Sequence, residues 1–162
     1  RSVIFGFNRV FFLDFARDFF RKNIEQQPVG HFMFRLDEPE QDAQGRPNPS
    51  FIPSDVDLPV GEGEEGRYLD LLAGGLERLA QLSVPDLAVV VDGADPYEHD
   101  ELPSTSQLRL SLAQLLSRDL AVYEFLQRLG VPSAWLMSGG YGERSWEVYA
   151  QFLEAVLPRR LP

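Results

Sequence analysis

A run of carboxylates follows one of the most apolar segments of the sequence. The segment Val89–Leu102, VVVDGADPYEHDEL, passes from valines into Asp92, Asp95, Glu98 and Asp100. Acids this close together repel one another unless a cation, a base or open water separates them. A carboxylate is also a suitable ligand for a divalent metal ion. The stretch therefore predicts either a strand end that binds a cation or a solvated acidic turn.

Two other apolar segments end in residues that could do chemistry. Asp14 closes the run Val10–Phe15, and Ser138-Gly139-Gly140-Tyr141 closes the run SAWLMS. In parallel α/β sheets, ligands collect beyond the C-terminal ends of the strands. We therefore expect these groups to converge with the Asp92–Asp95 pair at one edge of a sheet.

Alternating short apolar runs and amphipathic stretches predict the elements that position these groups. Strands are expected over Val10–Phe15, Gly30–Leu36, Asp86–Gly93 and Ser133–Ser138, with a short strand and turn in Val56–Gly63. Helices are expected over Ala16–Gln27, Glu65–Leu82, Ser106–Leu129 and Glu143–Leu157, and the proline-rich Glu38–Ser54 is expected to be a loop. This alternation predicts an α/β fold, with a three-layer parallel sheet and helices on both faces. The 162 residues are expected to form a single domain.

Composition excludes several classes of protein. The formal net charge of −10 argues against a nucleic-acid surface. The chain has no cysteine, which excludes disulfides and thiolate metal sites, and no run long enough to span a membrane. We expect a cytoplasmic protein. Because the sequence begins with Arg1 and not with methionine, we expect it to be part of a longer protein.

Several segments resemble the zinc-dependent histone deacetylase superfamily. They are VPDLAVVVDGADPYEHDEL (Val84–Leu102), VPSAWLMSGGYG (Val131–Gly142), DVDLPVGEGEEGRYLDLL (Asp55–Leu72) and RVFFLD (Arg9–Asp14). They are most similar to the bacterial acetoin-utilisation and acetylpolyamine-amidohydrolase branch and to the class IV deacetylases. The resemblance implies an arginase/deacetylase-like fold. It corresponds to roughly the C-terminal half of a family domain, so the predicted fold is incomplete.

The resemblance also implies roles for individual residues. Asp95 matches a ligand of the catalytic Zn²⁺, and Tyr141 matches the catalytic tyrosine whose hydroxyl polarises the substrate carbonyl. Gly139 and Gly140 match glycines of the substrate channel, and Asp14 matches a ligand of a monovalent cation, K⁺ or Na⁺. The implied substrate is an acylated amine of the acetyl-lysine or acetylpolyamine type.

The sequence departs from the family where the other zinc ligands should stand. The family carries Asp-x-Asp-x-His-x-Gly after the strand that leads to the metal, whereas this chain has DFARDFF. Either Ala16 and Asp18 replace an Asp and a His, or the loop is missing between Asp14 and Phe15. The catalytic histidine pair of the family has no counterpart in this sequence. Two interpretations follow: a metal-dependent amidohydrolase whose site is completed outside this sequence, or a catalytically dead domain that acts in binding or scaffolding.

Each candidate also has a plain structural role. Asp95 could cap a strand end before Pro96, Tyr141 could anchor a turn, and Asp14 could be a cap. The remaining acids and histidines are not expected to bind a metal. We expect Asp92, Glu98 and Asp100 to be solvated or at a channel rim. His99 is expected at the surface, and His31 in the core.

Overall fold

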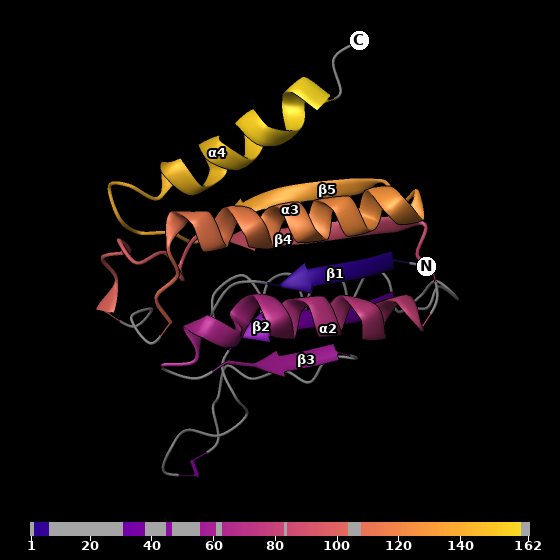
Figure 1. Ribbon diagram of the computed structural model, residues 1–162, viewed down its shortest axis with the longest axis horizontal. Coiled ribbons are helices and arrows are strands. Elements are labelled where there is room, and N and C mark those ends of the chain that lie inside the picture. Colours follow the sequence, from indigo (N-terminus) through magenta and orange to yellow (C-terminus); the bar gives the residue numbers. More distant parts are fainter. Residues whose placement is uncertain are drawn as a thin grey trace, which may run out of the picture.

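The computed structural model describes residues 2–6, 31–37, 45–46, 56–60, 63–82, 84–103 and 108–159 (Figure 1). Five strands in this part of the chain form one sheet: β1 (Ser2–Gly6), β2 (His31–Asp37), β3 (Val56–Pro59), β4 (Leu87–Gly93) and β5 (Ser133–Ser138). Their order is β3-β2-β1-β4-β5, and all neighbouring pairs are parallel. All five strands therefore end at the same edge, and the loops that follow β4 and β5 are neighbours.

The strand beside β4 is β1, which lies near the start of the sequence, before the predicted strand Val10–Phe15. β1 pairs with β2 and β4 in register, so that Ile4 lies opposite Met33 on one side and Val89 on the other. The strand predicted over Val10–Phe15, the helix predicted over Ala16–Gln27 and nearly all of the predicted loop Glu38–Ser54 lie outside the described residues. The other predicted strands are confirmed within a few residues of their expected bounds.

Helices follow the strands as the sequence predicts. They are η1 (Glu65–Arg67), α2 (Tyr68–Ala80), α3 (Leu112–Leu129), α4 (Trp146–Val156) and the short η3 (Leu157–Arg159). α3 starts later than its periodicity predicts. Leu110 instead forms a parallel bridge with Tyr97, and Ser111 closes a capping box with Gln114. These hydrogen bonds satisfy backbone groups at the helix start, so the chain enters the helix only after them. Gly130 ends α3 in the left-handed conformation, as its type and position predicted.

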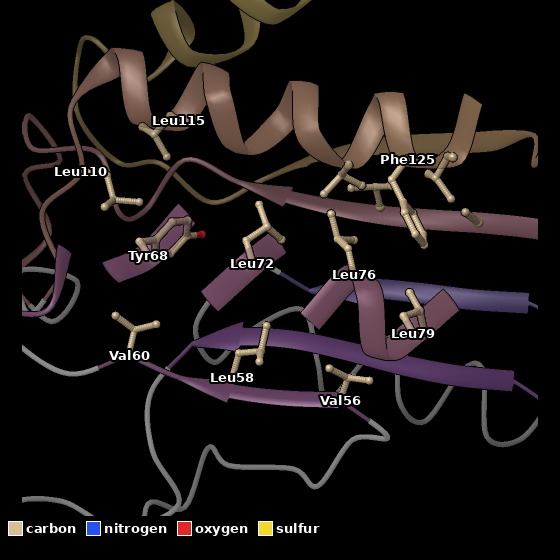
Figure 2. Packing of buried hydrophobic residues seen from close by; sticks show 14 of the residues in the cluster. Val56, Leu58, Val60, Tyr68, Leu72, Leu76, Leu79, Leu110, Leu115 and Phe125 are labelled. Atoms are coloured by element: carbon tan, nitrogen blue, oxygen red, sulfur yellow. The ribbon is translucent and has the colours of Figure 1, made fainter. Parts of the chain in front are cut away.

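The core lies between the sheet and the helices α2 and α3 (Figure 2). α2 contributes one apolar stripe at helical spacing, and β3 contributes every second residue, as each periodicity requires. The buried members labelled in Figure 2 are Val56, Leu58, Val60, Tyr68, Leu72, Leu76, Leu79, Leu110, Leu115 and Phe125. Burial of each large apolar side chain contributes on the order of 2 kcal/mol, so this layer contact stabilises the described part of the fold.

The fold class is confirmed as α/β with a parallel sheet. The described helices α2, α3 and α4 all contribute to one apolar cluster on one face of the sheet. The second helical layer that the sequence predicts is not among the described residues and stays a prediction. Within the described ranges, every helix is too short or too polar to cross a membrane.

Gly74 tests the contribution of helix propensity to α2. It lies in the helix interior, is exposed, and a methyl group added there would meet no heavy atom within 4 Å. We expect Gly74→Ala to raise the free energy of unfolding by about 0.5–1 kcal/mol in urea titrations, because alanine restricts the unfolded chain. Gly130→Ala should instead lower the free energy of unfolding, since Gly130 has φ +68°, a conformation that alanine adopts only with strain. Effects of the same sign would contradict this account.

Candidate functional site

The loops after β4 and β5 meet at the C-terminal edge of the sheet. The β4–β5 ladder extends one residue beyond the strands, where the Ala94 amide donates to the Ser138 carbonyl at 3.3 Å. Asp95 follows on one loop, and Gly139, Gly140 and Tyr141 follow on the other. The structure therefore brings together the candidate site residues that lie in its described part. Asp14 lies outside the described residues, so its role as a ligand of K⁺ or Na⁺ stays a prediction.

Asp95 is a buried carboxylate with spare bonding capacity. The residue is 5% exposed, and its carboxylate accepts hydrogen bonds from its own amide and from the amide of Gly140. Its Oδ2 atom has no hydrogen-bond partner among the described residues. Burial raises the pKa of Asp95 to about 6, and the two amides offset part of that rise. A buried carboxylate oxygen without a donor is costly, and a cation or a further donor at this position would remove that cost.

Gly140 is required where the two loops approach each other. Its φ is +85°, and a Cβ atom added there would lie 2.8 Å from the Ala94 Cβ and 2.9 Å from the Ser145 Cβ. A side chain would push the two loops apart and withdraw the Gly140 amide from Asp95. Gly140 is thus a point of close approach between the loops, and the assignment of Gly139 and Gly140 to a substrate channel stays a prediction.

Tyr141 has a fixed backbone and an accessible side chain. Its amide donates to Asp100 Oδ2 at 2.6 Å, while 52% of the residue is exposed. Burial of part of the ring raises the pKa of its phenol, and the nearby charges of Asp95 and Asp100 raise it further. The phenol therefore lies within electrostatic reach of the Asp95 carboxylate and stays protonated at neutral pH.

Further hydrogen bonds join the Asp95 loop to the chain after β5. Tyr97 donates its hydroxyl to Glu147 Oε2 on α4 at 2.7 Å. Within the Asp95 loop itself, Asp100 Oδ1 accepts from the Leu102 amide at 3.0 Å. Tyr149, also on α4, donates its hydroxyl toward the Gly139 carbonyl at 2.9 Å. α4 thus bonds to both loops, the one that carries Asp95 and the one that carries Tyr141.

A buried arginine lies behind this edge of the sheet. Arg118 on α3 is 0% exposed. Its Nη2 donates to Asp92 Oδ1 at 2.5 Å, its Nε donates to Asp119 Oδ1 at 2.6 Å, and its Nη1 donates to the Gly93 carbonyl at 2.8 Å. One guanidinium therefore fixes α3 to Asp92 and Gly93, the last two residues of β4, just before Asp95. The hydroxyl of buried Tyr68 lies beside the same group.

The cluster around Arg118 contains one cation for two carboxylates. Burial raises the pKa of Asp92, and the positive charge of Arg118 opposes that rise. Burial likewise raises the pKa of Asp119 to about 7, with the neighbouring charge of Asp92 raising it and that of Arg118 lowering it. Burial alone would lower the pKa of Arg118, but the two carboxylates outweigh it and the net shift is upward. Burial thus holds the pKa of both carboxyls above its ordinary value, and one guanidinium charge compensates the pair.

Two sequence-based expectations about the acids are wrong. Asp92 and Asp100 were expected to be solvated or at a rim, but both are buried. Asp92 is compensated by Arg118, and Asp100 by the amides of Leu102 and Tyr141; of these partners, Arg118 and Tyr141 are distant in sequence. Glu98 and His99 are exposed, as expected. Arg118 was not identified from the sequence, although an Arg-Asp pair within the apolar stretch LLSRDLAVYEF signals an ion pair on a buried helix face.

Comparisons with solved structures agree with this architecture. The chain superimposes on the crystal structure of a histone deacetylase (HDAC) homologue from Aquifex aeolicus with a TM-score of 0.60 and 15% identity, over 100% of this chain and 43% of that one. It matches an HDAC homologue complexed with SAHA with a TM-score of 0.58 and 16% identity, over 95% of this chain and 41% of that one. The chain has part of a deacetylase-type fold. No family model matches the sequence.

The match covers less than half of each of these structures. The predicted arginase/deacetylase-like architecture is therefore confirmed, and so is its incompleteness. At 15–16% identity the likeness concerns the fold alone.

Arg118→Met tests the buried cluster. It leaves Asp92 and Asp119 without a cation and the Gly93 carbonyl without its donor, so we expect a loss of about 3–5 kcal/mol in the free energy of unfolding. Arg128→Met is the matched control on the same helix, because Arg128 is exposed and lies over the Phe125 ring at 6.0 Å. Its cost should stay below about 1 kcal/mol. Similar costs for both variants would contradict the role of the cluster.

Asp95→Asn tests the unpartnered carboxylate in protein free of divalent metal. The pKa of Asp95 is raised to about 6 from 3.8, so the folded state binds the proton more tightly than the unfolded state. The contribution of Asp95 to stability is complete below about pH 4 and is lost as the pH rises through 6. Between pH 4 and 7 the free energy of unfolding should fall in both proteins. After allowing for solvent screening, we expect the fall to be about 1–2 kcal/mol smaller in the variant than in wild type. Parallel stability curves for the two proteins would contradict the buried charge.

Proposed function

We propose that this chain forms part of the active site of a metal-dependent amidohydrolase of the deacetylase type, which removes an acetyl or other acyl group from an amine. The observation that carries the proposal is the carboxylate of Asp95, which is buried at a strand end with its Oδ2 unpartnered among the described residues. It accepts from the amide of Gly140, and its charge contributes to the raised pKa of the Tyr141 phenol. The partial deacetylase-type fold supports the same assignment.

The donor chemistry of Asp95 fits one ligand of Zn²⁺. A hard anionic oxygen without a hydrogen-bond donor is the type of group that a catalytic zinc site uses. The described residues contain no group of three or more His, Cys, Asp or Glu side chains placed to hold a metal ion, so further ligands would have to come from outside them. When bound, Zn²⁺ would polarise the amide carbonyl and lower the pKa of a bound water molecule.

Tyr141 would donate a hydrogen bond to the substrate oxygen. Its phenol is accessible and stays protonated because its pKa is raised. As the carbonyl carbon becomes tetrahedral, negative charge develops on that oxygen, and a donor already in place stabilises it. Gly139 and Gly140 would let the backbone approach the acyl group without a side chain in the way.

The remaining parts of the predicted enzyme belong to the same proposal. Residues 1–162 would be the C-terminal half of the catalytic domain of a cytoplasmic protein, and the catalytic histidine pair and the other zinc ligands would lie outside this sequence. Asp14 would bind K⁺ or Na⁺. The substrate would be an acylated amine of the acetyl-lysine or acetylpolyamine type.

A second function, binding or scaffolding without catalysis, is favoured by the end of β1. β1 is the neighbour of β4 and ends at Gly6, and the next residues are Phe7-Asn8-Arg9-Val10. None of these side chains is a carboxylate or an imidazole, the groups that the resembled family places after its corresponding strand. If β1 is that strand, the fold has been kept and the metal site lost.

Zinc content separates the two functions. We expect the complete gene product, equilibrated with zinc and passed through a desalting column, to retain about one zinc per chain by elemental mass spectrometry. Asp95→Asn should remove most of it, because a neutral amide is a poor ligand. Glu98→Gln, which neutralises an exposed acid in the same loop, should retain it. Zinc retained by Asp95→Asn would refute the ligand role, and no zinc in any of the three would support the non-catalytic function.

Tyr141→Phe tests the proposed oxyanion donor. With an acetyl-lysine peptide as substrate, we expect kcat to fall about 10²- to 10³-fold while KM changes little, because the hydroxyl acts mainly in the transition state. Tyr123→Phe is the control, since Tyr123 packs against Phe152 between α3 and α4. A loss confined to KM would contradict the role of Tyr141.

A further inference from the structure

Carboxylates of the loop after β4 accept successive backbone amides from the loop after β5. The amide of Gly140 donates to Asp95, and the amide of Tyr141 donates to Asp100 Oδ2 at 2.6 Å. A hydrogen bond to an ionised carboxylate is roughly twice as strong as one between neutral groups. The acids of the first loop therefore hold the backbone of the second loop at the residue that carries the phenol.

Glycines allow the two loops to come this close. Tyr141 lies between Gly140 and Gly142, and both glycines approach the loop after β4. A Cβ atom added to Gly142 would lie 2.5 Å from the carbonyl oxygen of His99 and 3.5 Å from Asp100 Cα. These are backbone atoms, which cannot move aside as the end of a side chain can. The short bond between the Tyr141 amide and Asp100 thus depends on a side chain being absent at the next residue.

Asp100 is itself held in place by other parts of the fold. The residue is 7% exposed, its amide donates to the Tyr97 carbonyl at 2.8 Å, and its Oδ1 accepts from the Leu102 amide at 3.0 Å. Tyr97 is buried and is anchored to α4 by its bond to Glu147. Asp100 is therefore a fixed acceptor whose position does not depend on Tyr141.

Tyr141 needs such an anchor because its ring is not enclosed. Since 52% of the residue is exposed, packing around the ring does little to hold it. Its place depends instead on the backbone from which it projects, and the amide of that backbone is the group that Asp100 binds. A catalytic group displaced by about 1 Å can lose on the order of 100-fold in rate.

We propose that Asp100 is a positioning residue, whose buried carboxylate fixes the backbone of Tyr141 and thereby holds the phenol at the corner that Asp95 occupies. Asp100 acts through Tyr141 and does not touch the substrate. Its effect on turnover rests on the proposed function, in which the phenol is the oxyanion donor. Its effect on the placement of Tyr141 does not.

Asp100→Asn isolates the bond to Tyr141. Asparagine forms the same turn toward the Leu102 amide, but it then presents an NH2 group to the Tyr141 amide and has no charge. In the wild-type complete gene product we expect the Tyr141 amide to exchange with solvent on the order of 100-fold more slowly than in an unstructured peptide. The variant should lose at least about ten-fold of that protection.

The phenol of Tyr141 gives a second readout that needs neither zinc nor turnover. Asp100 contributes to the raised pKa of this phenol, so the Asp100→Asn variant should titrate it at a lower pH than wild type. The titration is followed by magnetic resonance of tyrosine labelled with ¹³C at Cζ. Glu101→Gln is the matched control, because Glu101 is an exposed acid of the same loop that accepts from the Glu143 amide at 3.1 Å. It should change neither the exchange of the Tyr141 amide nor the titration of the phenol.

A double-mutant cycle on turnover separates positioning from a general structural role. With an acetyl-lysine peptide, Asp100→Asn should lower kcat about 10- to 100-fold while KM changes little. In a Tyr141→Phe background the same substitution should lower kcat less than about three-fold, because the hydroxyl that Asp100 positions is already gone. Equal losses in the two backgrounds would show that Asp100 only stabilises the fold, and would overturn the proposal.

The exchange rates decide the proposal even in a protein without activity. An inactive gene product would refute the proposed function alone. A Tyr141 amide that exchanges like an unstructured peptide in wild type, or that keeps its full protection in Asp100→Asn, would overturn the positioning role. Should Asp100→Asn fail to fold, as its melting curve would show, the exchange of the wild-type amide decides by itself.

Discussion

The ion cluster around Arg118 is the interaction on which this edge of the sheet depends. A lone carboxylate inside a protein is very unfavourable, and a buried cation is equally so. Here one guanidinium, donated from α3, neutralises Asp92 and bonds to the carbonyl of Gly93 as well. The same group therefore makes the acidic strand end tolerable and fixes its direction. Asp95 begins its loop only two residues after that fixed point.

The acids that follow β4 are close in sequence but differ in environment. Asp92 has a cation as partner, and Asp100 has the amides of Tyr141 and Leu102. Glu98 is in water. Asp95 differs from all of them because one of its oxygens is buried without a partner in the described part of the chain. The environments of Asp92, Glu98 and Asp100 thus relieve their charges separately, and Asp95 is the acid of this run that keeps an unpartnered buried oxygen in the described part of the chain.

The loops after β4 and β5 form one corner of the candidate site. Among the described strands β5 is the last of the sheet, and Leu136 and Met137 on it are exposed. The loop that leaves β5 carries Tyr141 and supplies the amide that bonds to Asp95. The two loops meet because the strands are parallel, so that all of them end at one edge.

The sequence by itself determined the local structure and the likeness to a deacetylase. Periodicity located β4, β5, α2 and α4, and glycine and proline marked their ends, because these signals depend on neighbouring residues. It also placed Asp95 and Tyr141 after strands that end at one edge of the sheet. Only the tertiary structure decided that β1 is the strand beside β4, that α3 starts after the Leu110 bridge, and that Asp92 and Asp100 are buried. Those outcomes depend on Arg118, Tyr97 and the amide of Tyr141, partners that are distant in sequence, and local patterns contain no information about which distant group will neutralise a charge.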